Sequence, residues 1–529
     1  MFKKLRFLPL VIAVIMLLVS CGSSNTGNTT PANSQAPAAQ QNAPSTASQA
    51  PVAKSTKDTL IVAITSEPPN ADPHNNTHLV SFFVQKQVYD TLIVQDENGE
   101  IVPNLAERWE IIDDTTVRFF LRDDVYFHNG DKLTAEDVRY NIQRATELPS
   151  SRSVFSAFDG EGTAVVDDLT IDIKTHEPYA PIFNYLASSR GDIASKRAIE
   201  EIGEESFGHE PVGTGPFVFD KWVSGDRLEL VRNDNYWGHK PEYERMVVRF
   251  IPEAANRTIE LETGGADIIL NVAVNDKQRL LDNPQTGIVD GPAFRCIYFT
   301  FNQNYEPFNN LKFRQAVAHA LDLEAIVESV WMDTGQVADG HLAPTVFAYK
   351  SIGVHEYNPE KAKALLAEAG FPNGTKIEML VGQDRAFIDI CEIAQNMLGQ
   401  VGIEVELQIL ESAASTKMTS EGTYPFGLTS SSPGTGDPDH GLMIFPSNYT
   451  GALMLRDERF DDILTRGKAT FESEARKEVY AELLQLNYDE VYTLPVCYTD
   501  LIYGIRSNVQ GFRFEAGSRP DLKYVTFSE

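Results

Sequence analysis

The sequence predicts an α/β protein with mixed sheets flanked by helices, because strand-like and helix-like segments alternate along one folded body. The apolar run at 59–65 is typical of a buried strand, and residues 116–122 and 169–175 alternate apolar and polar side chains like half-buried strands. Apolar residues recur at helical spacing over 311–331. Residues 358–370 form a second helix that begins and ends with typical capping residues.

The clearest single unit lies between residues 376 and 410. A strand at 376–382, a helix at about 386–400 and a strand at 403–410 predict a right-handed crossover in a parallel sheet. Ligands of such sheets bind beyond the carboxyl ends of the strands. Arg385 follows the first strand at that end and is a binding candidate on this geometry. The alternative is that Arg385 only caps its own loop.

The amino-acid composition argues against several classes of function. The chain has 529 residues, 42% of them hydrophobic, so it buries a large core and is not disordered as a whole. Its 75 acidic residues outnumber 45 basic ones, which gives a net charge of −30. This balance argues against binding to nucleic-acid backbones and against electrostatic docking on anionic lipid.

The cysteines are too few and too scattered for a disulfide framework or a zinc site. Cys296 and Cys497 lie in apolar, strand-like runs and are expected to be buried thiols. A bridge between these two cysteines is the alternative, since export would permit it.

Residues 1–20 have the pattern of a signal peptide. Three cations precede an apolar run at 7–19, which as a helix would be about 20 Å long and too short to cross a bilayer. The run ends in Leu-Val-Ser-Cys at 18–21, which resembles the bacterial lipobox. The resemblance implies a diacylglyceryl or palmitoyl lipid on Cys21. A signal peptide that merely ends near a cysteine is the alternative.

Residues 21–57 are predicted to form the lipidated cysteine and a flexible stalk. Ser, Asn, Thr, Pro, Ala, Gln and Gly dominate the segment after Cys21, and it contains no aromatic residue. Such a segment cannot bury enough surface to fold. The folded body is therefore expected outside the cytoplasm, anchored to the membrane by the lipid.

Known catalytic motifs are missing. The sequence has no GxSxG, HExxH, GxxxxGK[ST] or strand-linked GxGxxG. His74 and His78 have metal-ligand spacing, but the surrounding residues predict a loop in which both side chains are solvated. We therefore expect no enzyme activity, with an exported hydrolase as the competing class.

Several blocks of the body resemble family-5 solute-binding proteins, the peptide- and nickel-binding components of bacterial ABC importers. The resemblance is carried by residues 104–109, 117–138, 211–217, 233–237 and 307–317, in the expected order. It implies a two-lobed periplasmic-binding-protein-like fold (type II, cluster C-like) with an inserted subdomain.

The same resemblance implies a division of the body. Lobe I would comprise 58–94, 210–300 and 495–529; an inserted subdomain II would comprise 95–209, and lobe III 301–494. The protein would act as a monomer without a cofactor. A solute would shift an open–closed equilibrium toward the closed form that the membrane permease recognises.

Dipeptide- and oligopeptide-binding members of this family clamp the ligand amine with an Asp that follows a Trp in lobe III. The corresponding positions here are Gly434 and Ser431, so both clamp residues are missing. Two alternatives remain: Asp437 or Asp439 substitutes for the clamp, or both aspartates only cap a turn. The dipeptide-binding members hold the ligand carboxylate with an Arg near the position of Arg385, and a guanidinium suits a planar carboxylate.

Nickel-binding members instead hold a metal–chelator complex, using two arginines from subdomain II and in some cases a histidine. Arg152 and Arg190 fall at the segments that carry those arginines, and His440 is the matching metal-ligand candidate. Short peptides or peptide-like carboxylates are the leading ligand class. A nickel–chelator complex is the alternative, ahead of opines and oligosaccharides.

Overall fold

The computed structural model describes residues 57–528 except 77, 97–98, 153, 292–294, 450, 500 and 516–518. The predicted signal peptide at 1–20, Cys21 and nearly all of the stalk at 21–57 lie outside these residues. No helix of the described part is both long and apolar enough to cross a membrane.

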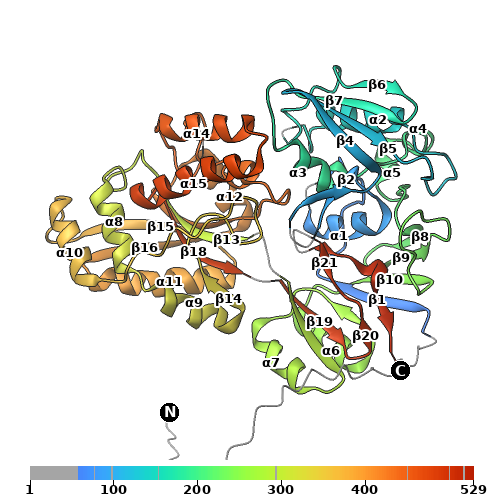
Figure 1. The fold of residues 1–529 in the computed structure, drawn as a ribbon. Helices are drawn as coiled ribbons and strands as arrows, with labels where there is room; N and C mark the ends of the chain where they lie inside the picture. The colour runs from blue at the N-terminus through green and yellow to red at the C-terminus, as the bar shows by residue number, and fades with distance from the viewer. Residues whose placement is uncertain are drawn as a thin grey trace, which may run out of the picture. The chain divides into compact units, whose positions relative to one another are not determined.

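Lobe I is built on a seven-stranded mixed sheet. Its core strand β1 pairs in parallel with β10 and β11. Helix α1 packs on one face of this sheet, and helices α6 and α7 pack on the other (Figure 1). In spatial order the strands are β12 (Thr286–Gly291), β19 (Leu501–Arg506), β11 (Ile268–Ile269), β1 (Thr59–Ile64), β10 (Arg245–Phe250), β9 (Arg227–Arg232) and β8 (Phe217–Val223). The helices are α1 (Leu79–Val88), α4 (Lys196–Ile202), α5 (Glu204–Phe207), α6 (Ala254–Thr263) and α7 (Val274–Asp282).

Subdomain II is a four-stranded antiparallel sheet covered by helix α2. Its strands, in spatial order, are β4 (Ala106–Asp113), β5 (Thr116–Leu121), β7 (Thr170–Lys174) and β6 (Ala164–Asp167). The other elements are the β2–β3 pair (Ile93–Gln95 and Ile101–Pro103), α2 (Ala135–Glu147), α3 (Ile182–Ala187) and the 3-10 helix η1 (Ser189–Gly191).

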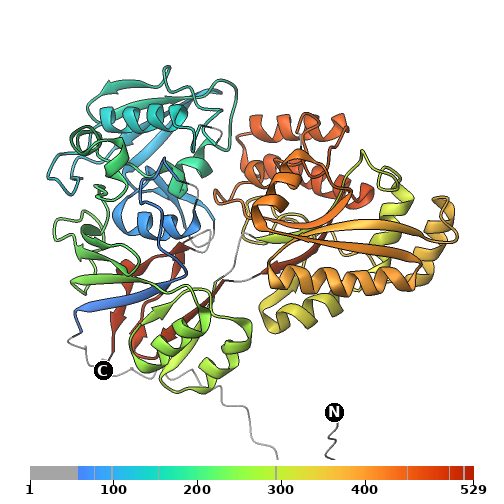
Figure 2. The same cartoon turned by 180° about the vertical axis from the view of Figure 1, so that it is seen from behind.

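Lobe III has a six-stranded mixed sheet with helices on both faces. Helices α8 to α11 pack on one face and helices α14 and α15 on the other (Figures 1 and 2). The strands, in spatial order, are β14 (Gly335–Val337), β18 (Thr493–Thr499), β13 (Cys296–Phe301), β17 (Phe426–Ser431), β15 (Thr375–Gly382) and β16 (Ile403–Leu410). The helices are α8 (Leu311–Ala320), α9 (Leu323–Trp331), η2 (Met332–Thr334), α10 (Pro359–Glu368), α11 (Arg385–Gln400), α12 (Ser412–Glu421), α13 (Pro438–Gly441), α14 (Glu458–Ala469) and α15 (Ser473–Glu490).

The chain passes between these two large sheets twice. It leaves lobe I after β12 and enters lobe III at β13, then returns between β18 and β19. The predicted boundaries at 300 and 495 fall inside β13 and β18, and both strands belong to the lobe III sheet. The C-terminal segment adds the pairs β20 (Val509–Gln510) with β23 (Thr526–Phe527) and β21 (Phe514–Glu515) with β22 (Arg519–Pro520), and the 3-10 helix η3 (Leu522–Tyr524).

The predicted crossover is confirmed. Strands β15 and β16 pair in parallel in register from Thr375–Ile403 to Gly382–Leu410, with α11 between them in sequence. The helical pattern at 311–331 is divided into α8 and α9 instead of being continuous. The break falls at Leu321 and Asp322 because the Asp322 side chain accepts a hydrogen bond from the backbone N–H of Ala325 and caps a new helix.

Cys296 and Cys497 are buried free thiols. Cys296 lies opposite Tyr498 and Ile297 lies opposite Cys497 in the β13–β18 ladder. Neighbouring residues of a strand point to opposite faces, and Cys296 and Cys497 indeed pack in the cores on the two sides of the sheet. This arrangement rules out the alternative of a bridge between them in this fold.

Candidate functional site

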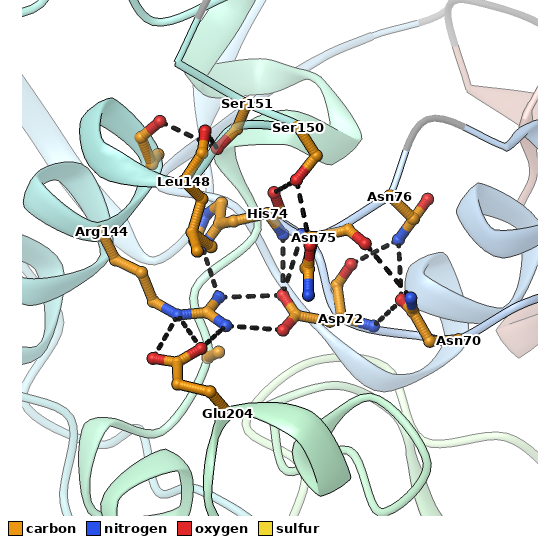
Figure 3. Close-up of polar contacts among 12 residues, drawn as sticks. Asn70, Asp72, His74, Asn75, Asn76, Arg144, Leu148, Ser150, Ser151 and Glu204 are labelled. Carbon is orange, nitrogen blue, oxygen red and sulfur yellow. Dashed lines mark hydrogen bonds and ion pairs between the residues drawn. The ribbon is translucent and has the colours of Figure 1, made fainter.

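A buried charge network fixes the loop that precedes α1 against subdomain II (Figure 3). The guanidinium of Arg144, on α2, donates two hydrogen bonds to the Asp72 carboxylate, at 2.8 and 2.6 Å. It also pairs with Glu204 of α5. Burial alone would raise the pKa of Asp72, but the hydrogen bonds and charge of Arg144 outweigh it and lower that pKa. The network therefore joins three separate segments through one cation.

His74 belongs to the same network, so the prediction of a solvated side chain is wrong. It is only 2% exposed, because the loop folds inward around Asp72. Arg144 Nη1 donates to His74 Nδ1 at 3.2 Å, so Nε2 carries the ring proton and donates to the backbone of Arg190. Burial and the adjacent Arg144 lower the pKa of His74 to about 3. The neutral ring thus positions the backbone of Arg190.

Arg190 lies in η1, and its guanidinium has no protein acceptor at one end. The backbone N–H of Arg190 is held by the Ser188 hydroxyl at 3.3 Å, and its side chain lies 5.3 Å from the Phe82 ring centroid. Nη1 is buried and has no hydrogen-bond partner among the residues that the structure describes. Burial lowers the pKa of Arg190. A buried donor without an acceptor is costly, so this group is suited to an anionic ligand.

His440, on α13 of lobe III, is close to Arg190. Its Nδ1 atom is also buried without a partner, and burial, followed by the charge of Arg190, lowers the pKa of His440. The structure therefore brings together two of the predicted site residues, one from subdomain II and one from lobe III. Each has an unused polar atom.

Asp437 is engaged inside lobe III. Its carboxylate receives two hydrogen bonds from Arg476, at 2.7 and 2.8 Å, and the carboxylate is fully buried. Arg476 also donates to the carbonyl of Gly467. The Asp437 side chain further caps α13 by accepting from the backbone N–H of Asp439. This geometry anchors the loop that carries His440.

Asp439 makes contacts on both sides of the lobe boundary. It accepts hydrogen bonds from the hydroxyls of Tyr179 at 2.7 Å and Tyr185 at 3.4 Å, both in subdomain II. Lys468 of lobe III pairs with the same carboxylate at 3.0 Å, and its carbonyl accepts from the backbone N–H of Ala180 at 2.7 Å. These contacts join subdomain II to lobe III.

The other two predicted arginines are exposed. Arg385 begins α11, is 73% exposed and pairs with Asp389 one turn along the helix. Arg152 is exposed just after α2. Their roles in binding stay predictions.

Sequence analysis did not single out Arg295. It lies directly before β13, largely buried, and its guanidinium is 5.1 Å from the Phe387 ring centroid. The available signal was a single basic residue directly before a mainly apolar strand.

Metal-ligating side chains are not gathered in the described part of the chain, where no group of three or more His, Cys, Asp or Glu could hold a metal ion.

Two lobes, two chain crossings, and Arg190 of subdomain II close to His440 of lobe III are typical of extracytoplasmic solute-binding proteins. Residues 100–452 match the family described as bacterial extracellular solute-binding proteins, family 5 Middle. The chain belongs to this family, whose members are transport binding proteins.

The chain is similar to heme-binding protein A of Haemophilus influenzae, with 28% identity over 547 residues and 96% of each chain covered. It is 26% identical to the dipeptide-binding protein of Escherichia coli K12, covering 78% of this chain and 84% of that protein. The solved structure of HbpA2 from Haemophilus parasuis has a TM-score of 0.81 and 27% identity, and the match covers 89% of this chain and all of that one.

Asp437 is expected to be a major determinant of stability. Asp437→Asn leaves Arg476 buried without a counter-ion, so the free energy of unfolding should fall by about 3–5 kcal/mol in chemical denaturation. Asp462→Asn, which breaks an exposed pair with Arg466, is the control and should cost less than about 1 kcal/mol. Equal effects of the two substitutions would contradict the structural role of Asp437.

His74 is expected to make folding sensitive to acid. Its pKa is about 3 in the folded protein and 6.5 ordinarily, so below pH 6.5 only the unfolded chain takes up the proton. The free energy of unfolding should therefore fall by about 1.4 kcal/mol per pH unit between pH 6.5 and pH 3 on account of this residue. In His74→Gln the free energy of unfolding should lose this part of its pH dependence. An unchanged dependence on pH in that variant would contradict a neutral, buried His74.

Proposed function

We propose that this protein captures short peptides or peptide-like carboxylates between its lobes and delivers them to the permease of an ABC importer. The observation that carries the proposal is the buried Nη1 of Arg190, close to the buried Nδ1 of His440, both without a hydrogen-bond partner among the described residues. The guanidinium presents parallel N–H groups to a planar carboxylate, and neutral His440 offers a further donor or acceptor. The dipeptide-binding relative supports the ligand class.

The positions of Arg190 and His440 would couple solute binding to closure of the lobes. A solute that touches Arg190 of subdomain II and the His440 loop of lobe III binds the closed form better than the open form, and so shifts the equilibrium toward closure. Asp439 already joins the same two parts through Tyr179 and Tyr185. The protein would perform no catalysis, and turnover of any solute by the purified protein would contradict this.

A nickel–chelator complex is the second candidate ligand, and His440 Nδ1 is the observation that favours it. A neutral imidazole nitrogen without a hydrogen-bond partner can coordinate a metal while Arg190 holds a carboxylate of the chelator.

We further propose that residues 1–20 are a cleaved signal peptide and that Cys21 carries the lipid anchor. The stalk at 21–57 would let the monomeric body move at the membrane surface while it delivers its solute. The lipobox-like segment and the composition of the stalk support this.

Arg190 is expected to be essential for solute capture. Native mass spectrometry of the purified protein, before and after mild denaturation, should release a small peptide or carboxylate. Arg190→Gln should lower the affinity for the released compound about 10- to 100-fold in calorimetry, since a hydrogen bond to a charged group contributes about 1.5–3 kcal/mol. Arg108→Gln, at an exposed position of β4 in the same subdomain, is the matched control and should change affinity less than about threefold.

Metal analysis of the same sample separates the two ligand classes. Stoichiometric nickel with a small polycarboxylate or histidine would favour the second candidate, and His440→Ala should then release the metal. An R190Q variant that binds its solute as tightly as the native chain would refute the proposed site.

Cys21 is expected to determine the location of the protein. Cys21→Ala should abolish metabolic labelling with palmitate and move the protein from the membrane fraction to the soluble extracytoplasmic fraction. Cys391→Ala, at a buried position of the body, is the control and should retain both label and membrane association. Unchanged fractionation of C21A would contradict the anchor.

A further inference from the structure

Most buried arginines of the described chain have conventional partners. Arg144 and Arg476 pair with carboxylates. Arg257 donates to four backbone carbonyls, and Arg314 donates to backbone carbonyls and to the side chain of Gln303. These partners offset the cost of taking each guanidinium out of water.

Arg295 differs from this group. Within the described residues its guanidinium makes no hydrogen bond and no ion pair, and its contact is the face of the Phe387 ring. Burial lowers the pKa of Arg295, and the charge of Asp384 opposes this lowering without closing an ion pair. Asp384 is already engaged, since it accepts from the backbone N–H groups of Ala386 and Phe387 at the start of α11.

The position of Arg295 places it at the edge of lobe III where a solute would arrive. It precedes β13 at the chain crossing from lobe I, and β13 runs antiparallel to β17 and β18. The start of β13 therefore lies beside Ser431 and Tyr498, at the ends from which the His440 loop and the second crossing leave. The carboxyl end of β15 and the first turn of α11 reach the same edge.

We propose that Arg295 binds an anionic group of the solute, and that it rather than Arg385 provides the carboxylate contact of lobe III. This inference rests on the proposed solute-binding function and deepens it. Together with Arg190 it defines the ligand class as a solute with at least two carboxylates, one for subdomain II and one for lobe III. Arg385 already has Asp389 as its partner and is solvated, so it has less to gain from a ligand.

Removal of an unpaired buried cation should also change the melting temperature differently from removal of a paired one. Removal of a partnered buried arginine leaves acceptors without donors and lowers the melting temperature. Removal of Arg295 relieves an unpaired charge, so the ligand-free Arg295→Gln variant should melt at the same temperature as the native chain or higher. Arg314→Gln is the control and should melt several degrees lower.

The binding experiment uses a library of di- and tripeptides with free carboxylates and the same library with amidated C-termini, each screened by thermal shift and then calorimetry. In the native chain, peptides with an acidic side chain and a free C-terminus should bind best. Amidation should weaken them about 10- to 100-fold. In R295Q the affinity for the free peptides should fall by a similar factor and amidation should lose its effect, while R385Q should behave like the native chain.

The outcomes separate this inference from the function on which it rests. If R295Q binds free peptides as the native chain does, or melts as low as R314Q, Arg295 is not a ligand residue, although the protein remains a peptide-binding protein. If R385Q rather than R295Q loses the response to amidation, the contact belongs to Arg385. If neither library binds the native chain, the proposed peptide function fails and the inference fails with it.

Discussion

The pairing of buried guanidinium groups is the interaction on which this structure most depends. A buried cation is tolerated when a carboxylate or several carbonyls receive its N–H groups. Arg144 pairs with Asp72 and Glu204 and so joins the loop before α1 to α2 and α5. Arg476 pairs with Asp437 and holds its loop in place. Arg190 and Arg295 lack such partners in the described structure; Arg190 lies close to His440 of lobe III, and Arg295 directly precedes the first strand of that lobe.

The acidic composition makes the lack of partners at Arg190 and Arg295 in the described structure informative. With 75 acidic residues against 45 basic ones, an unpaired arginine does not result from a shortage of carboxylates. The nearby carboxylates are engaged elsewhere: Asp72 by Arg144, Asp437 by Arg476, Asp384 by the first turn of α11 and Asp389 by Arg385. Asp384 thus acts on Arg295 through its charge without pairing with it, and a local preference for anions coexists with a net charge of −30.

The sequence predicted much of the fold because hydrophobic periodicity and capping are local properties. The β15–α11–β16 unit and helix α10 were predicted for this reason. The division of 311–331 at Asp322 was missed because an apolar pattern continues across a cap. At the site, the location of Arg385 directly after a predicted strand made it a candidate. Only the folded chain shows that Arg385 forms an ion pair with Asp389, and that Arg295 has no ion pair among the described residues. The burial of His74 was likewise missed because Arg144, which holds it, lies 70 residues away in sequence.

The contacts of Asp439 across the boundary between subdomain II and lobe III affect how the protein discriminates between solutes. Two tyrosine hydroxyls and Lys468 contact this carboxylate within the protein itself, so part of the free energy of closure does not depend on a solute. A solute shifts the equilibrium only by its difference in affinity for the two forms. If the contacts of Asp439 contribute the same free energy of closure for every solute, discrimination between solutes depends on polar groups that lack a hydrogen-bond partner within the protein. Arg190, His440 and Arg295 are three such groups, and under the proposed function a compound that leaves any of them unpaired gains less from closure than one that engages all three.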